Sequence, residues 1–119
     1  MSERSMLLYL HDILDAGTAI QTYLEGCAFD IFVQDRMRQS AVIREFEIIG
    51  EAVGKLPGGM KELCPDVPWQ DIKDFRNLLA HEYFGVDLEI VWNTVINDLP
   101  ILLVSVRRLM SESGGCSST

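Results

Sequence analysis

The chain has 119 residues, 48% of them hydrophobic, which is enough for one compact domain with its own core. The first residues lack the composition of a secretory signal. The longest apolar run, Leu99 to Val104, is far shorter than the roughly 20 residues that cross a bilayer. We therefore expect a cytoplasmic protein without a membrane role, with one helical domain over 1–112 and a disordered tail over 113–119.

The net charge of −8 argues against broad nucleic-acid binding, because phosphate binding relies on concentrated Lys and Arg. The ten basic residues are scattered, so folding or dimerisation must gather them at any local phosphate site. Three cysteines without CxxC spacing and two distant histidines, His11 and His81, form neither a disulfide framework nor a zinc site. We expect reduced thiols, no metal and no cofactor.

Apolar residues recur at spacings of three and four from about 4 to 25, which predicts a first helix ending near Gly26. A second, amphipathic helix comes next, and its start is open: Asp30 could cap a helix from Ile31, and 34–40 could be helix or break. The apolar face of this helix consists of Val42, Phe46, Ile49, Val53 and Leu56.

Two glycines, Gly50 and Gly54, lie inside this second helix. A glycine in a helix costs about 1 kcal/mol relative to alanine, so we expect a closely packed neighbouring helix there. The segment 56–59 should end the helix, because proline and two glycines disfavour its continuation.

A third helix should begin near Pro68 and bury Trp69, Ile72, Phe75 and Leu79. Asp87 can cap a fourth helix, and Pro100 should kink or divide the segment after it. Asp98 could then cap a fifth segment to about Met110, with Arg107 and Arg108 in its last turn. The apolar face of the fourth helix consists of Leu88, Val91, Trp92, Val95 and Leu99.

These elements predict an all-α fold, an antiparallel bundle of four to five helices. Apolar residues exceed one face per helix: Ile48 lies on the polar side of the second helix, and 101–104 is apolar all round. We infer that part of this surface is buried in a homodimer. The alternative is that a short chain buries these residues internally.

Reactive side chains gather at the end of the third helix, where Arg76, Asn77, His81, Glu82 and Tyr83 fall within eight residues. On an ideal helix Asn77 and His81 are adjacent, whereas Arg76 and His81 are about 140° apart around the axis. Three arrangements could bring them together. The helix loosens before His81, the arginine side chain sweeps across, or two copies of the motif meet at a dimer axis.

Histidine exchanges protons near its pKa of about 6.5, and arginine offers a planar fork to phosphate oxygens. Together they suit cleavage of RNA, whose 2′-OH supplies the nucleophile, so that proton transfer and charge stabilisation suffice without a metal. Asn77 could orient His81 or donate to phosphate, and Tyr83 could bind phosphate or stack on a base. Structural roles are the alternative: Arg76 paired with Asp71 or Glu82, His81 as a helix cap, and Tyr83 as half-buried core.

Arg76-x4-His81-x-Tyr83 resembles the Arg-x4-His-x-Tyr motif of HEPN-domain proteins, specifically the HepT-type toxins. The stretches 41–52 and 81–92 resemble two further signatures of that family, and the resemblance runs from the first helix to about Met110. It implies a HEPN-like all-α homodimer whose motifs face each other across a cleft. It also implies a metal-independent endoribonuclease that acts on RNA, tRNA included.

The resemblance further implies a partner, a nucleotidyltransferase antitoxin that transfers AMP to Tyr83, as in type VII-like toxin–antitoxin systems. An added phosphate and nucleoside would fill the pocket beside Arg76 and neutralise its charge. In this reading His81 is the general acid or base, Arg76 stabilises the scissile phosphate, and Asn77 and Tyr83 contact RNA. Two alternatives stay open: a non-catalytic nucleotide-binding or accessory subunit of a nucleotidyltransferase, and a hydrogen-bond network at a dimer interface.

Overall fold

The computed structural model describes residues 3–81 and 87–113, and all regular secondary structure in these ranges is helical. Short helices α2 and α4 lie in the connections between longer ones. The elements in chain order are α1 (Glu3–Tyr23), α2 (Phe29–Gln34), α3 (Arg36–Lys55), α4 (Gly58–Glu62), α5 (Trp69–His81), α6 (Leu88–Asn93), η2 (Thr94–Asp98) and α7 (Leu99–Ser113). The predicted all-α class is confirmed.

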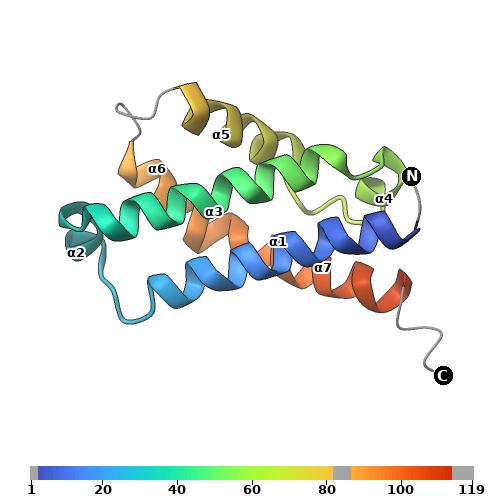
Figure 1. Ribbon diagram of the computed structural model, residues 1–119, viewed down its shortest axis with the longest axis horizontal. Coiled ribbons are helices and arrows are strands. Elements are labelled where there is room, and N and C mark those ends of the chain that lie inside the picture. The colour runs from blue at the N-terminus through green and yellow to red at the C-terminus, as the bar shows by residue number, and fades with distance from the viewer. Residues whose placement is uncertain (1–2, 82–86, 114–119) are drawn as a thin grey trace.

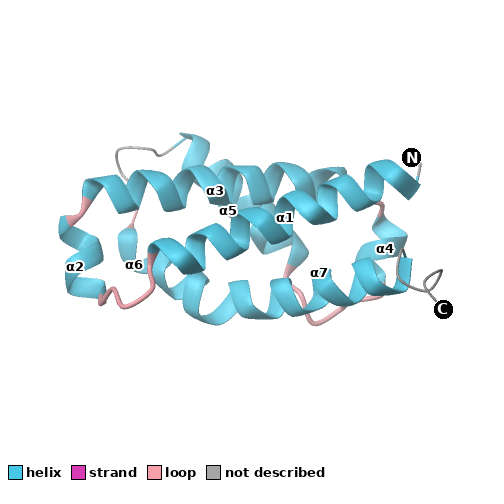
Figure 2. Cartoon of the chain, turned by 60° about the horizontal axis from the view of Figure 1, so that its bottom comes forward, coloured by secondary structure: helices cyan, strands magenta, loops and turns pink. Residues whose placement is uncertain are grey.

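The long helices form an antiparallel bundle in which α3 lies between α1 and α5 (Figure 1). Figure 2 shows α7 along α1, with the start of α1 and the end of α7 at the same end of the bundle. Each long helix runs opposite to the one before it, as expected of helices joined by short connections.

The core lies along the bundle axis and takes residues from every long helix. No polar or charged residue in the described ranges is fully buried. The largest side chains with almost no exposure are Leu10, Ile13, Ile20, Phe32, Ile49, Leu79, Leu99, Leu102, Leu103 and Leu109. Their helical spacing confirms the apolar faces predicted for the first three long helices.

Local signals set the helix ends. Gly26 has a φ of 71°, in the left-handed region that favours glycine, which confirms the predicted end of the first helix. Asp35 resolves the open start of α3, because its carboxylate accepts a 3.1 Å hydrogen bond from the backbone N–H of Arg38. Asp30 is not a cap, since α2 begins at Phe29 and Asp30 lies in its first turn.

The prediction that 56–59 only ends a helix missed α4, whose first residue is Gly58. Of the two predictions for Pro100, a kink or a division, the division is wrong. Instead, α6, η2 and α7 form one continuous run, and the turn before the proline is a π-helix in which the Leu99 N–H donates to the Thr94 carbonyl. The wider π-turn accommodates Pro100, which has no N–H to donate and whose ring would crowd the preceding turn of an α-helix. Asp98 therefore lies inside the run and caps nothing.

The last helix is longer than predicted. It ends at Ser113, the residue at which the sequence predicts the tail to begin, and 114–119 lie outside the described residues. Arg107 and Arg108 consequently precede the last turn. By length and composition alone, Leu88–Glu112 could cross a membrane, a test that core helices of soluble bundles also pass. About 28% of the tested window is buried, and this run exposes Ile90, Ile96, Ile101 and Val104.

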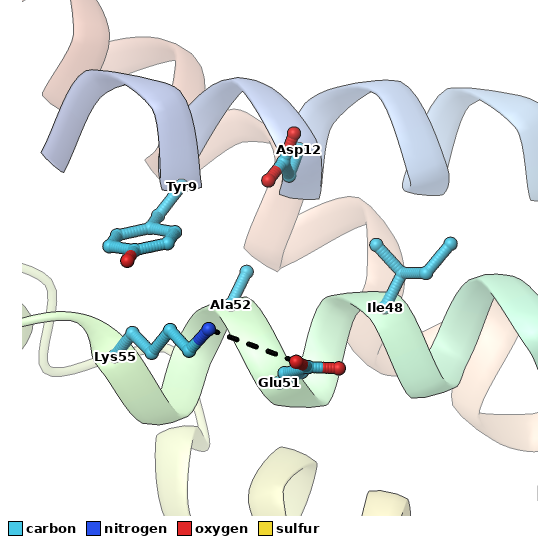
Figure 3. Close-up of a pocket in the computed structure, with 6 residues that line it drawn as sticks. All are labelled: Tyr9, Asp12, Ile48, Glu51, Ala52 and Lys55. Atoms are coloured by element: carbon cyan, nitrogen blue, oxygen red, sulfur yellow. Dashed lines mark ion pairs between the residues drawn. The ribbon is translucent and has the colours of Figure 1, made fainter. Parts of the chain in front are cut away.

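The excess apolar residues divide between core and surface. Leu102 and Leu103 are buried, whereas Ile101 is 42% and Val104 is 65% exposed. Ile48 is half-buried and points toward α1 (Figure 3), so it packs internally. Internal burial thus accounts for Ile48, and the homodimer stays a prediction that rests on the exposed residues.

Candidate functional site

Helix α5 presents three different surfaces. Ile72, Phe75 and Leu79 are buried in the core. Lys73, Arg76 and Asn77 line a pocket against α3, and we call them the basic flank. Asp71, Asp74 and Leu78 line a separate groove against the run Leu88–Asp98, and we call them the acidic flank. The helical period separates residues of opposite charge that are neighbours in sequence.

Arg76 is seated directly on Gly50 of α3. A Cβ added to Gly50 would overlap the Cβ of Arg76 and lie 2.5 Å from its Cγ. Ordinary contact between carbon atoms requires about 3.5–4.0 Å, so only glycine permits α5 to approach so closely. This confirms the predicted closely packed neighbour at Gly50 and identifies the residue that needs it.

The Arg76 guanidinium makes no ion pair within the described part of the chain. Its Nε is buried and has no hydrogen-bond partner there. Asp71, the proposed structural partner, lies on the opposite flank of α5 and lines the other groove. A buried donor without a partner is costly unless something else satisfies it. Packing thus holds Arg76 in place, and within the described residues its guanidinium has no carboxylate partner.

The pocket beside Arg76 is open and has a volume of about 170 Å³. It is lined by Gly50, Glu51, Gly54, Lys73, Arg76 and Asn77. Asn77 is exposed, as expected of a residue that contacts a ligand from the rim. The structure therefore brings Arg76 and Asn77 together at one pocket.

Two residues of this pocket, Lys73 and Glu51, were not singled out from the sequence. Lys73 lies three residues before Arg76 and four before Asn77, and this spacing was the available signal. Glu51 forms a 3.8 Å ion pair with Lys55 on the side of α3 that faces α1 (Figure 3). Its charge is thereby partly neutralised within α3.

The motif histidine ends the helix. Helix α5 continues as an α-helix through His81, so the alternative in which it loosens before that residue is wrong. The contact with Gly50 also directs Cβ and Cγ of Arg76 toward α3. On an ideal helix, positions 76 and 81 lie about 140° apart around the axis. The side chain of His81 and all of Glu82 and Tyr83 lie outside the described residues.

Two other arginines, Arg38 and Arg108, are engaged in contacts away from this pocket. Arg38 pairs with Asp35 at 2.9 Å and donates to the Tyr23 carbonyl. Arg108 donates to the Leu63 carbonyl and lies 3.5 Å from the Glu112 carboxylate. These contacts hold helices and connections together. The basic flank of α5 is therefore the better candidate for an anion site.

Two other cavities lack the motif residues. The pocket in Figure 3 lies between α1 and α3, and its cation, Lys55, is engaged by Glu51 and lies 5.4 Å from the centre of the Tyr9 ring. The groove along the acidic flank is lined by three carboxylates and repels phosphate. In the described ranges no three side chains are grouped to hold a metal ion.

The chain matches the family model described as “Ribonuclease HepT-like” over residues 13–109. It is 42% identical over 100 residues to “Probable ribonuclease HepT” of Thermococcus cleftensis, covering 84% of this chain and 91% of the relative. It is 36% identical over 115 residues to “Putative RNase MJ0127” of Methanocaldococcus jannaschii, covering 97% and 95%.

A third relative, “Putative RNase TTE0752” of Caldanaerobacter subterraneus subsp. tengcongensis, is 38% identical over 104 residues, covering 87% of this chain and 93% of its own. No solved structure was found to match significantly. The family match spans α3 and α5, and it therefore includes the Gly50–Arg76 seat and the pocket beside it.

Proposed function

Because the chain belongs to the HepT-like ribonuclease family and is an endoribonuclease, we propose that it is the toxin of a type VII-like toxin–antitoxin pair. It acts in the cytoplasm and cleaves RNA, tRNA included, without a metal. Its site consists of Arg76, Asn77, His81 and Tyr83.

The observation that carries this proposal is the uncommitted Arg76 guanidinium on its glycine seat. Its Nε is buried without a partner beside an open pocket, where a phosphate oxygen can accept from it. Arginine presents several donors in one plane, and these match the equatorial oxygens of the phosphorane-like transition state of RNA cleavage. Asn77 on the rim supplies a further donor.

The remaining chemistry is proton transfer. The 2′-OH next to the scissile phosphate attacks phosphorus and loses its proton, and the 5′-oxygen leaves and gains one. His81 serves one of these transfers, because its ordinary pKa of about 6.5 allows both protonation states at cellular pH. The pocket of Arg76 and the end of α5 form one site when two copies of the chain meet in a homodimer.

The proposed partner is a nucleotidyltransferase antitoxin that transfers AMP to the phenol oxygen of Tyr83. Tyr83 comes seven residues after Arg76 in the sequence and belongs to the same Arg-x4-His-x-Tyr motif. The transferred phosphate would satisfy Arg76 in place of RNA, and the nucleoside would block entry. Modification thereby switches the toxin off.

A second candidate is a non-catalytic nucleotide-binding or accessory subunit of a nucleotidyltransferase. The net charge of −8 favours it, since it limits the surface that attracts RNA. In that case Arg76 holds the phosphate of a nucleotide, and His81 contributes to binding alone.

One experiment distinguishes the two candidates. The wild type, His81→Ala and Arg76→Ala are each expressed in cells, and the RNA 5′ ends are then sequenced. Arg107→Ala is a matched control, because it removes an exposed arginine of α7 far along the chain from the motif. We expect growth arrest and new RNA ends from the wild type and the control only. RNA that is unchanged by the wild type would contradict the toxin and favour the accessory subunit.

A further inference from the structure

The cationic surface at the site continues beyond Arg76 toward the start of α5. Lys73 lies one turn before Arg76, and the two residues are about 4.5 Å apart along the helix axis. Lys61 of α4 lies beyond Lys73, and these are two of the three lysines in the chain. The third, Lys55, is paired with Glu51.

Lys73 also crosses a glycine of α3, but without the close approach of Arg76. A Cβ added to Gly54 would lie 3.9 Å from the Lys73 Cε, so the lysine stem passes over the glycine at ordinary contact distance. Gly50 and Gly54 are one turn apart on α3, as Arg76 and Lys73 are on the antiparallel α5. The two glycines therefore accommodate two successive cationic side chains along one edge of the pocket.

Lys61 is held near this edge by the first residue of α5. The indole N–H of Trp69 donates to the carbonyls of Lys61 and Cys64, both at 3.0 Å, and ties α4 to the start of α5. Burial lowers the pKa of Lys61, and the positive charge of Lys73 lowers it further. Lys73 lies one turn after Trp69 on the same face of α5, so the residue that binds the Lys61 carbonyl is a neighbour of Lys73, and each lysine lies within range of the other's charge.

The carboxylates near this edge do not neutralise it. In the described part of the chain, Lys61 and Lys73 form no ion pair. Glu51, which lines the pocket, is paired with Lys55 at 3.8 Å. The acids of α5 lie on the acidic flank and line the other groove. Two neighbouring positive charges repel each other. An anion bound between them offsets this repulsion, so the two lysines favour anion binding.

We propose that Lys61 and Lys73 form a subsite for the RNA backbone that holds phosphates flanking the scissile phosphate at Arg76. Both ammonium groups donate to non-bridging phosphate oxygens, without reading the base sequence. This inference rests on the proposed function. It explains how a protein with a charge of −8 binds RNA: one edge from α4 to the end of α5 carries the cations, and repulsion elsewhere keeps RNA off other faces.

The test measures binding of a short fluorescein-labelled single-stranded RNA by full-length protein in a His81→Ala background, over a series of KCl concentrations. Lys73→Ala and Lys61→Ala should each reduce the slope of log K against log salt by about 0.7, the value for one phosphate contact on a single strand. Affinity should fall several-fold. Arg107→Ala is the matched control, with the same charge change at an exposed cation of α7 that does not line the pocket.

Cleavage kinetics give a second readout in the catalytically competent protein. Lys73→Ala should raise KM several-fold and leave kcat nearly unchanged, because it removes binding shared by ground state and transition state. Arg76→Ala should lower kcat. Lys73 is exposed, so its variant should fold, and circular dichroism checks this.

The outcomes separate the two claims. A wild type that cleaves RNA, with salt slopes of Lys61→Ala and Lys73→Ala equal to the parent, overturns the subsite and leaves the proposed function intact. Equal losses in Arg107→Ala also overturn it, since they would show a general effect of net charge. A wild type that neither cleaves RNA nor gives ends in cells removes the proposed function itself.

Discussion

Gly50→Ala is the substitution that most directly tests the seat of Arg76. The new methyl group would overlap the Arg76 Cβ, lie 2.5 Å from Cγ and lie 3.5 Å from Cα. Contact with Cγ alone could be relieved by a change of rotamer. The Cβ of Arg76, however, is fixed to the backbone, so α5 must move away from α3 by roughly 1 Å to restore ordinary contact.

The expected loss of stability results from two opposing effects. Overpacking of a tight interface costs about 1–3 kcal/mol. Replacing a helical glycine by alanine returns about 1 kcal/mol, because the unfolded chain loses conformational freedom. The net destabilisation should be about 0–2 kcal/mol, or at most about 15 °C in Tm for a domain of this size. The variant should therefore still fold.

The loss of activity should be larger than the loss of stability predicts. A displacement of about 1 Å at a group that contacts the reacting phosphate can cost about 100-fold in rate. RNA cleavage should be measured well below the Tm of the variant, so that unfolding does not contribute. The assay then reports the position of Arg76 alone.

Gly54→Ala is the matched control, one turn along the same helix. Its methyl group would lie 3.9 Å from the Lys73 Cε, an ordinary contact, so we expect a Tm equal to or above that of the wild type and full activity. Gly50→Ala with wild-type activity would refute the seat. So would equal damage from both substitutions, because the distances at the two glycines differ too much to allow it.

Two further predictions concern stability. Burial and the neighbouring Asp71 raise the pKa of Asp98 above its usual 3.8, so the folded state binds this proton more tightly and ionisation at higher pH opposes folding. Asp98→Asn should raise Tm at neutral pH and give no gain well below pH 3.8; a gain that is largest in acid would reverse the sign. Trp69→Phe removes the indole donor to the Lys61 and Cys64 carbonyls, which keep their backbone donors, so it should cost about 0.5–1.5 kcal/mol in urea unfolding; an unchanged midpoint would show that these bonds contribute nothing.

Much of the fold is determined by the local pattern of the sequence. The apolar period placed the long helices, Gly26 marked the end of the first, and Gly50 required a close neighbour. Each of these depends on residues within a few turns. Pro100 was misread because a proline that usually breaks a helix is accommodated here by a π-turn, which depends on how the whole run packs.

The site was only partly predictable for the same reason. The sequence pointed to Arg76 and Asn77, but the partner of Gly50 depends on how α5 packs against α3, which lies outside any local window. Lys73 belongs to no recognisable motif. Its place at the site becomes evident only from the fold, which divides the charged residues of α5 between two flanks. Arg38 and Arg108 looked available in the sequence, yet folding engages both with nearby carbonyls and carboxylates.

The geometry of α5 favours the proposed homodimer as the way in which Arg76 and His81 act on the same phosphate. The helix is regular through His81, and the base of Arg76 is pressed against Gly50, so the two residues stay about 140° apart within one chain. A second copy related by a two-fold axis can present its His81 to the Arg76 pocket of the first. Under this proposal, each active site takes its arginine from one protomer and its histidine from the other.

This arrangement predicts complementation between inactive variants. Arg76→Ala and His81→Ala homodimers should each be inactive, but a mixed dimer contains one site with an intact arginine from one protomer and an intact histidine from its partner. Random exchange of equal amounts makes half of the dimers mixed, each with one of two sites intact, so RNA cleavage should recover to about a quarter of the wild-type level. If both residues instead act within one chain, every site in the mixture lacks one of them, and no activity returns after exchange.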